Sequence, residues 1–212
     1  MNYIVSAIIG YLLGSIPTAY FVLKKTHNLD VTETGSGNAG AMNSFEITNS
    51  KVVGLVVLVI DALKGLLSVY LCLLIFPINF VYPALALFFA VFSHCFNPWL
   101  NFKGGRGLAT AAGGAALLSP LILISWGALW VLLFLLKKDI LIANVGATIL
   151  TIFFALSSID LIFNYTYPTP DSYSTLVLFS SGLLTIIFIK HIEPLKEIIS
   201  NFKNSGKRKK DE

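Results

Sequence analysis

Long apolar stretches alternate with short polar segments along this chain, and most of these stretches are long enough to be membrane-spanning helices. A helix needs roughly 20 apolar residues to cross the hydrocarbon core of a bilayer. Two of the stretches are shorter, and they are separated only near Ser119-Pro120. The apolar runs cover residues 4–23, 52–76, 78–93, 108–118, 121–136, 140–163 and 174–189.

The distribution of basic residues indicates that the two short runs are separate spans. Cytoplasmic loops of membrane proteins collect Lys and Arg, and a single span over 108–136 would move Lys137 and Lys138 outside. With separate spans and an external N-terminus, the basic positions that fall inside are Lys24, Lys25, Lys51, Lys103, Arg106, Lys137, Lys138 and those from Lys190 onward. The sequence therefore predicts an all-α bundle of seven transmembrane helices, with the N-terminus outside and the C-terminus in the cytoplasm.

Composition supports an integral membrane protein with one domain. Charged residues make up 12% of the 212 residues and the mean hydropathy is +0.79, whereas a soluble domain has about 25% charged residues. We expect a single transmembrane domain over 1–200 and a basic, disordered tail over 201–212. The first run has no basic residue before it and no cleavage site after it, so we expect it to remain as a span.

The scarce metal-ligating residues argue against a cofactor. The two Cys and three His residues are not spaced as a metal site, and we expect no metal, no other cofactor and no nucleic-acid partner. The run Lys207-Arg208-Lys209-Lys210 could bind anionic membrane lipids. We favour a simpler role for this run as a topology signal.

The first of two glycine-rich polar segments is Gly35-Ser36-Gly37-Asn38-Ala39-Gly40, which is followed by Asn43. It matches the dinucleotide-binding pattern G-x-G-x-x-G, but that pattern requires a preceding strand, and here a membrane helix precedes it. Its free backbone N–H groups, the Ser36 hydroxyl and the amides of Asn38 and Asn43 suit an anion. A tight turn that requires glycine explains the segment equally well.

The second glycine-rich segment is Lys103-Gly104-Gly105-Arg106-Gly107, which follows a stretch beginning at His94. Cations beside flexible backbone suit phosphate oxygens. A basic turn that only sets topology needs no cluster of glycines, so this segment favours a binding function.

Ionisable residues within the apolar runs are few. Asp61 and Lys64 are three positions apart on one helix face, and we favour a structural ion pair over contact between Lys64 and a substrate. His191 lies at the cytoplasmic end of the last run, where acid–base chemistry is possible. A single interfacial His is weak evidence by itself.

Taken together, four segments resemble the bacterial acylphosphate:glycerol-3-phosphate acyltransferase family, most strongly over residues 10–112. The segments are Gly14-Ser15-Ile16-Pro17-Thr18-Ala19-Tyr20, Gly35-Ser36-Gly37-Asn38, Asp61 with Lys64-Gly65, and His94 to Thr110. The resemblance implies an inner-membrane enzyme with seven spans and a cytoplasmic active site. Such an enzyme transfers a fatty acyl group from acyl phosphate to the 1-hydroxyl of glycerol 3-phosphate. The products are lysophosphatidic acid, for phospholipid biosynthesis, and phosphate, and the reaction needs neither coenzyme A nor metal.

The resemblance also implies roles for individual residues. Ser36, Lys103 and His191 correspond to catalytic positions. Asp61, Lys64 and Glu193 are assigned structural roles. The implied substrate-binding residues are Gly37, Asn38, Asn43, Gly104, Gly105, Arg106, Gly107 and Asn144.

The chain departs from the family pattern at several of these positions. Glu46 stands where an Arg is usual, Leu141 and Asn144 stand where serines are usual, and Pro194 replaces an Asn. An anion beside a phosphate site should weaken phosphate binding. Candidates to supply the missing cation are Lys51, Lys64 and Lys190.

Two alternatives to the enzyme therefore remain open. The loops could hold a phosphorylated solute in a transporter or lipid-binding membrane protein, although the few intramembrane charges argue mildly against transport. The chain could also be a family member in which the departures have reduced or redirected catalysis.

Overall fold

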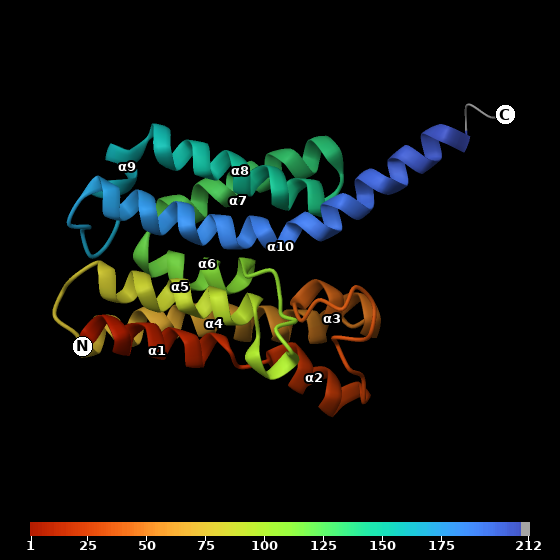
Figure 1. Cartoon of the computed structure of the whole chain (residues 1–212), viewed down its shortest axis with the longest axis horizontal. Helices are drawn as coiled ribbons and strands as arrows, with labels where there is room; N and C mark the ends of the chain where they lie inside the picture. Colours follow the sequence, from red (N-terminus) through yellow and green to blue (C-terminus); the bar gives the residue numbers. More distant parts are fainter. Residues whose placement is uncertain (209–212) are drawn as a thin grey trace.

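The computed structural model describes residues 1–208, with the side chains of 197–199 and 201–208 left aside. Long helices run side by side in two groups (Figure 1): α1, α4, α5 and α6 form one, and α7, α8 and α10 form the other. The helices are α1 (Asn2–Gly14), α2 (Thr18–His27), α3 (Ala41–Thr48), α4 (Lys51–Ile75), α5 (Val81–Cys95), α6 (Leu108–Leu118), α7 (Pro120–Lys137), α8 (Ile140–Ser157), α9 (Ile159–Asn164) and α10 (Tyr173–Arg208), with a 3-10 turn at Pro98–Leu100.

The fold is all-helical over the described residues, as the sequence predicts. Within that part of the chain, 6 helical segments are long and apolar enough to cross a membrane. They are Asn2–His27, Lys51–Ile75, Val81–Leu100, Pro120–Lys137, Ile140–Ser157 and Tyr173–Lys196. Helix α6 is apolar but shorter, at 11 residues.

Helix α6 turns back into α7 at the place where the sequence predicts a break. Pro120 is the first residue of α7, where its missing N–H and fixed φ suit a helix start. Figure 1 shows α6 running away from the second glycine loop and α7 running back. At the turn, the Leu118 carbonyl accepts from the Tyr167 N–H at 2.9 Å, and Ser119 Oγ lies 3.0 Å from Thr166 Oγ1.

The first apolar run is broken, although the sequence predicts one span over 4–23. Pro17 separates α1 from α2 because proline cannot donate a helical hydrogen bond, and α2 bends away from the axis of α1 (Figure 1). The run predicted at 140–163 is likewise divided, into α8 and α9. Helix α10 extends through Arg208, into the stretch expected to be disordered, and residues 209–212 lie outside the described part.

Glycines allow the helices of the first group to pack closely. A Cβ added to Gly65 of α4 would collide with the Thr110 carbonyl oxygen of α6, and one on Gly113 would collide with the Ala62 carbonyl oxygen of α4. Close backbone approach at small residues is the usual way for helices to associate in a membrane. The main apolar core lies between α4, α5, α6, α8 and α10, around Leu87, Leu118, Leu176 and Ile187.

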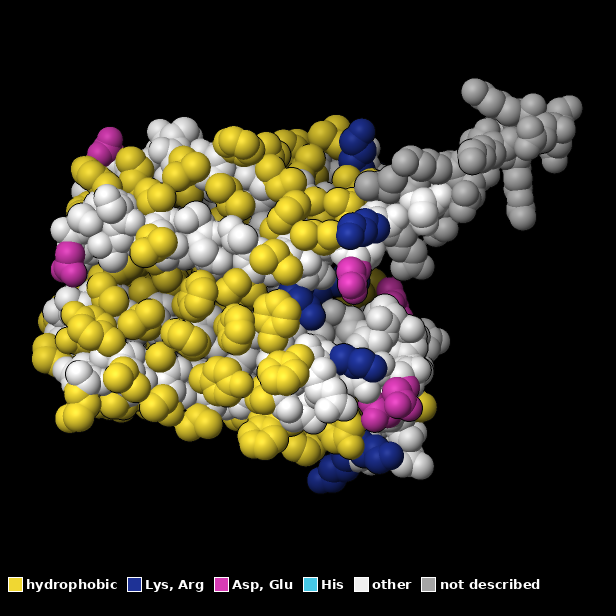
Figure 2. All heavy atoms as spheres, in the orientation of Figure 1, with side chains coloured by type: hydrophobic (Ala, Val, Ile, Leu, Met, Phe, Trp, Pro, Cys, Tyr) yellow, Lys and Arg dark blue, Asp and Glu magenta, His cyan; other side chains and the backbone are white. Residues whose placement is uncertain are grey.

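Both glycine-rich segments lie at the same end of the bundle, together with α2 and α3. On the face shown in Figure 2, most Lys and Arg side chains also gather at that end, and the long middle zone is hydrophobic. The molecule therefore has a basic end with irregular backbone and an apolar belt suited to lipid.

Candidate active site

Asn43 organises the first glycine-rich segment. It lies buried in the first turn of α3, and its Oδ1 accepts from the Ser36 N–H at 3.0 Å. Its Nδ2 lies 3.1 Å from the Thr34 carbonyl, 3.0 Å from the Asn38 carbonyl and 3.4 Å from the Val31 carbonyl. Gly35 and Gly37 have φ values of 63° and 69°, which glycine adopts without strain. The loop is therefore held in one shape with the Ser36 side chain exposed.

The second glycine-rich segment packs against the end of α5. The Gly105 N–H donates to the His94 carbonyl at 3.1 Å. A Cβ on Gly104 would collide with the same carbonyl, and one on Gly105 would collide with His94 Nε2. Gly107 then begins α6 with a φ of 84°. Glycine is required here because the loop backbone lies directly on His94.

The two segments touch each other. The Gly104 carbonyl accepts from the Ala39 N–H at 3.4 Å and from Asn38 Nδ2 at 3.5 Å. Segments separated by 66 positions thus meet at one end of the bundle, as a shared anion site requires.

A cavity of about 460 Å³ opens beside this contact. Its wall comes from the first glycine loop, α3, Arg106 and the turn between α7 and α8. The lining residues are Ser36, Asn38, Met42, Asn43, Glu46, Arg106, Phe134, Lys138, Asp139, Ile140 and Leu141. The charged groups are two cations, Arg106 and Lys138, and two anions, Glu46 and Asp139.

Arg106 is the more buried of the two cations in this wall. Its Nε is buried and has no hydrogen-bond partner among the described residues. Burial lowers the pKa of the Arg106 guanidinium, and the Glu46 carboxylate offsets part of that effect. A guanidinium remains protonated near neutral pH even so, so the cavity holds a partly desolvated cation with donor capacity available for an anion.

The structure places four of the expected substrate-contacting residues on this cavity: Ser36, Asn38, Asn43 and Arg106. Lys103 is not among the lining residues. Its exposed side chain lines a second cavity of about 670 Å³ on the α1–α2 side, with Leu12, Ile16, Trp99 and others.

His191 is buried in α10, and its tautomer is defined by a hydrogen bond. Its Nδ1 lies 2.8 Å from the Ile187 carbonyl, which can only accept, so Nδ1 carries a proton. In the neutral ring this leaves a lone pair on Nε2, which is buried without a partner among the described residues. Glu193, two positions further on, is exposed.

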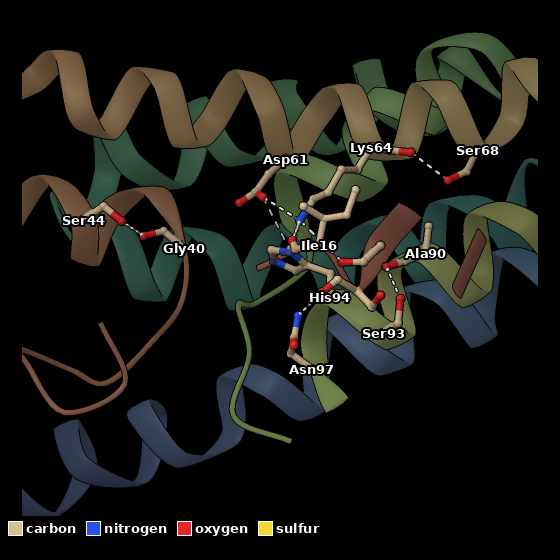
Figure 3. Close-up of polar contacts among 12 residues, drawn as sticks. Ile16, Gly40, Ser44, Asp61, Lys64, Ser68, Ala90, Ser93, His94 and Asn97 are labelled. Atoms are coloured by element: carbon tan, nitrogen blue, oxygen red, sulfur yellow. Dashed lines mark hydrogen bonds and ion pairs between the residues drawn. The ribbon is translucent and has the colours of Figure 1, made fainter. Parts of the chain in front are cut away.

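The expected ion pair of Asp61 and Lys64 is present. Lys64 Nζ lies 2.8 Å from Asp61 Oδ1 and 2.9 Å from the Ile16 carbonyl. It also lies 3.3 Å from His94 Nδ1 (Figure 3). All three side chains are buried. Lys64 therefore links the break between α1 and α2 to the histidine under the second glycine loop.

Asn144 lies away from the cavity wall. It is buried on α8, and its Oδ1 accepts from Trp130 Nε1 of α7 at 2.7 Å. This hydrogen bond between side chains joins α7 to α8. The turn between these two helices lines the cavity.

Sequence reasoning did not find the contribution of the α7–α8 turn. Lys138 and Asp139 line the cavity, but in the sequence the basic pair before Asp139 was explained fully as a topology signal. The expected substitute cations do not line it. Lys64 is engaged as above, Lys190 lies 5.0 Å from the centre of the Phe96 ring, and Lys51 is an exposed first residue of α4.

The described residues contain no group of three or more His, Cys, Asp or Glu side chains placed to hold a metal ion. What the site offers instead is backbone, amide and guanidinium donors at one end of an apolar helical bundle. This arrangement defines a membrane-integral protein with donors suited to an anionic group at one end of the bundle.

Comparisons with known proteins agree with this class. The family model described as Glycerol-3-phosphate acyltransferase matches residues 4–201. The chain is 32% identical over 211 residues to the glycerol-3-phosphate acyltransferase of Pseudothermotoga lettingae, covering 100% of this chain and 96% of that protein. It is 34% identical to the enzyme of the same name from Enterococcus faecalis, covering 93% and 89% of the two chains.

Solved structures of PlsY, an integral membrane glycerol 3-phosphate acyltransferase, have the same fold. Its glycerol 3-phosphate form matches with a TM-score of 0.78 and 26% identity, covering 95% of this chain and 94% of that chain. Its lysophosphatidic acid form matches with a TM-score of 0.76 and 25% identity, covering 95% and 93%. The chain belongs to the glycerol-3-phosphate acyltransferase family and is an acyltransferase.

Proposed function

We propose that this enzyme transfers a fatty acyl group from acyl phosphate to the 1-hydroxyl of glycerol 3-phosphate. The acyl carbon–oxygen bond to phosphate breaks, and an ester to the glycerol oxygen forms. The products are lysophosphatidic acid and inorganic phosphate, in the first acylation of phospholipid synthesis. The observation that carries this proposal is the contact between the two glycine loops beside a cavity that contains Arg106.

The site supplies donors suited to phosphate oxygens. Ser36 offers its hydroxyl, Asn38 its amide and Arg106 its guanidinium, while Gly37, Gly104, Gly105 and Gly107 let the backbone approach closely. Such fixed donors contribute by positioning the substrates and by neutralising charge that develops during transfer. We assign Lys103, whose side chain lines the second cavity on the α1–α2 side and which precedes the contact at Gly104, to the phosphate of the donor.

Acyl phosphate is already activated, because its leaving group is phosphate. The donor phosphate can therefore accept the proton of the glycerol hydroxyl, without a protein base. Replacing His191 with Ala should then leave measurable turnover in a phosphate-release assay. A general-base role for its Nε2 predicts a loss of about 100-fold or more instead.

We also propose seven crossings, with the N-terminus outside and the glycine loops facing the cytoplasm across the inner membrane. Helix α6 supports this, because it leads from the second glycine loop to the far end of the bundle, where Leu118 meets Tyr167. The gathering of basic residues at the loop end agrees with a cytoplasmic location.

Purified protein in detergent, supplied with palmitoyl phosphate and glycerol 3-phosphate, tests the reaction. Phosphate release should require both substrates and should disappear in Lys103→Ala. Lys25→Ala, an exposed position at the end of α2, is the matched control and should retain activity. Binding of either substrate without release would contradict acyl transfer and would favour a transport or lipid-binding role.

A further inference from the structure

The turn between α7 and α8 brings a second cation to the active-site cavity. Lys138 caps the C-terminal end of α7, where its N–H donates to the Phe134 carbonyl at 2.8 Å, and both residues line the cavity. Its side chain is exposed, and no ion pair joins it to another described residue. The ammonium is thus free to meet a ligand at the water-facing rim.

The position of the turn is fixed by the surrounding structure. Asp139 caps α8 by accepting from the Ile142 N–H at 2.8 Å. Trp130 of α7 stacks on Phe134 with 5.2 Å between ring centres, and its Nε1 donates to Asn144 of α8. Lys138 also holds a φ of 54°, which an L-residue rarely adopts. A rigid pair of helices therefore presents this lysine at the cavity.

The charges on the cavity wall indicate that phosphate binding needs a second cation in addition to Arg106. Glu46 and Asp139 place two carboxylates on a wall where Arg106 and Lys138 are the cations. Without Lys138, an incoming phosphate dianion would face one guanidinium and two anions. With it, two cations of the cavity wall are available to the phosphate.

The carboxylates indicate which substrate these cations hold. Glycerol 3-phosphate carries two hydroxyl groups that can donate to Glu46 and Asp139, whereas the head of an acyl phosphate has no hydroxyl on carbon. Building on the proposed function, we propose that Lys138 and Arg106 bind the phosphate of glycerol 3-phosphate, while Glu46 orients its hydroxyl groups.

Steady-state kinetics of Lys138 variants test this assignment. Lys138→Asn removes the charge and suits a positive φ, so it separates loss of charge from backbone strain. We expect the KM for glycerol 3-phosphate to rise about tenfold, with kcat and the KM for palmitoyl phosphate within about twofold of wild type. Lys138→Arg should recover most of the affinity. Lys137→Ala is the matched control, because Lys137 is exposed on the same turn but does not line the cavity.

The results separate this inference from the proposed reaction. An active wild type with an unchanged KM for glycerol 3-phosphate in Lys138→Asn overturns the role of Lys138 and leaves acyl transfer standing. A rise confined to the KM for palmitoyl phosphate overturns the assignment to the acceptor. Calorimetric binding of glycerol 3-phosphate that depends on Lys138, in a protein without turnover, supports this site and contradicts the reaction.

Discussion

At the residue scale, the first glycine loop depends on one buried amide. Replacing Asn43 with Ala removes an acceptor for the Ser36 N–H and a donor shared by three carbonyls. Buried polar groups left without partners cost about 1–3 kcal/mol each. We expect a lower melting temperature in detergent and a KM for glycerol 3-phosphate raised at least several-fold.

Two further variants test the reason for that loss. Asn43→Asp keeps an acceptor for Ser36 but directs a carboxylate oxygen at the three carbonyls, so it should be as damaging as Ala. Ser44→Ala is the control, because the Ser44 hydroxyl only donates to the Gly40 carbonyl just before α3, at 2.9 Å, and that carbonyl keeps the Ser44 N–H as a partner. If Asn43→Asp behaved as wild type, Asn43 would not organise the loop through its NH₂ group.

A methyl group on Gly105 should disturb the second loop without unfolding the protein. The added Cβ would collide with His94 Nε2, and the His94 ring cannot move freely because Lys64 lies 3.3 Å from its Nδ1. We expect Gly105→Ala to reduce kcat/KM by about tenfold or more, as small displacements of positioning groups do. Gly127→Ala is the control: nothing lies within 4 Å of its added Cβ, so activity should be unchanged. Equal activity of the two variants would contradict a close fit at Gly105.

The sequence predicts the types of residues in the site better than their directions. Ser36, Asn38 and Arg106 lie on one cavity, because glycine-rich turns with polar side chains restrict what the backbone can do, and their contact with substrate stays a prediction. Lys103 lines another cavity, since the direction of a side chain in a loop depends on the neighbours that the fold supplies. Lys138 escaped notice because topology alone explained a basic pair at that position.

At the element scale, a buried ion pair within α4 contacts the break between α1 and α2 and the end of α5. Lys64 of α4 donates to the Ile16 carbonyl at the break before α2, which also accepts from the Thr18 N–H, and pairs with Asp61. Removing one partner of a buried ion pair costs about 3–5 kcal/mol, because the other charge stays buried. Both single variants, Asp61→Asn and Lys64→Met, should lower the melting temperature in detergent.

Comparison of these variants identifies the role of the carbonyl. Lys64→Met should be the more damaging change, because it also removes the ammonium contacts with the Ile16 carbonyl and with His94 Nδ1. The double variant should be more stable than the sum of the single losses predicts, since it leaves no unpaired charge. Strict additivity in the thermal unfolding of the four proteins would contradict an energetically coupled pair.

The sequence predicted helix boundaries where hydropathy changes sharply along the chain. It missed those where the hydropathy stays the same and only the capacity of the backbone for hydrogen bonding changes. The boundary at Ser119-Pro120 was found because Pro120 coincides with a gap between apolar runs. The break at Pro17 was missed because apolar residues continue on both sides of it. The Ile16 carbonyl at the break accepts from the Thr18 N–H and from Lys64, which is distant in sequence. Helix α3 was missed because eight polar and apolar residues between two loops carry no strong periodicity.

At the scale of the whole molecule, the proposed topology requires α6 to cross the membrane although it is short. Its 11 residues extend about 16 Å at 1.5 Å per residue, roughly half of the hydrocarbon thickness. Irregular backbone at membrane depth is tolerated where protein surrounds it. Helix α6 is largely buried against α4 and α5, and the Tyr167 N–H satisfies the Leu118 carbonyl at its end. The bundle therefore permits a seventh crossing that length alone does not support.

Cysteine labelling in intact cells tests this topology. Thr169 and Glu33 are exposed at opposite ends of the bundle, whereas the native Cys72 and Cys95 are buried and should give little background. A membrane-impermeant maleimide should label Thr169→Cys from outside. It should label Glu33→Cys only after the inner membrane is permeabilised, because seven crossings place the first glycine loop in the cytoplasm. Labelling of both positions from outside would mean that α6 does not cross, and the charge argument for the cytoplasmic site would then fail with it.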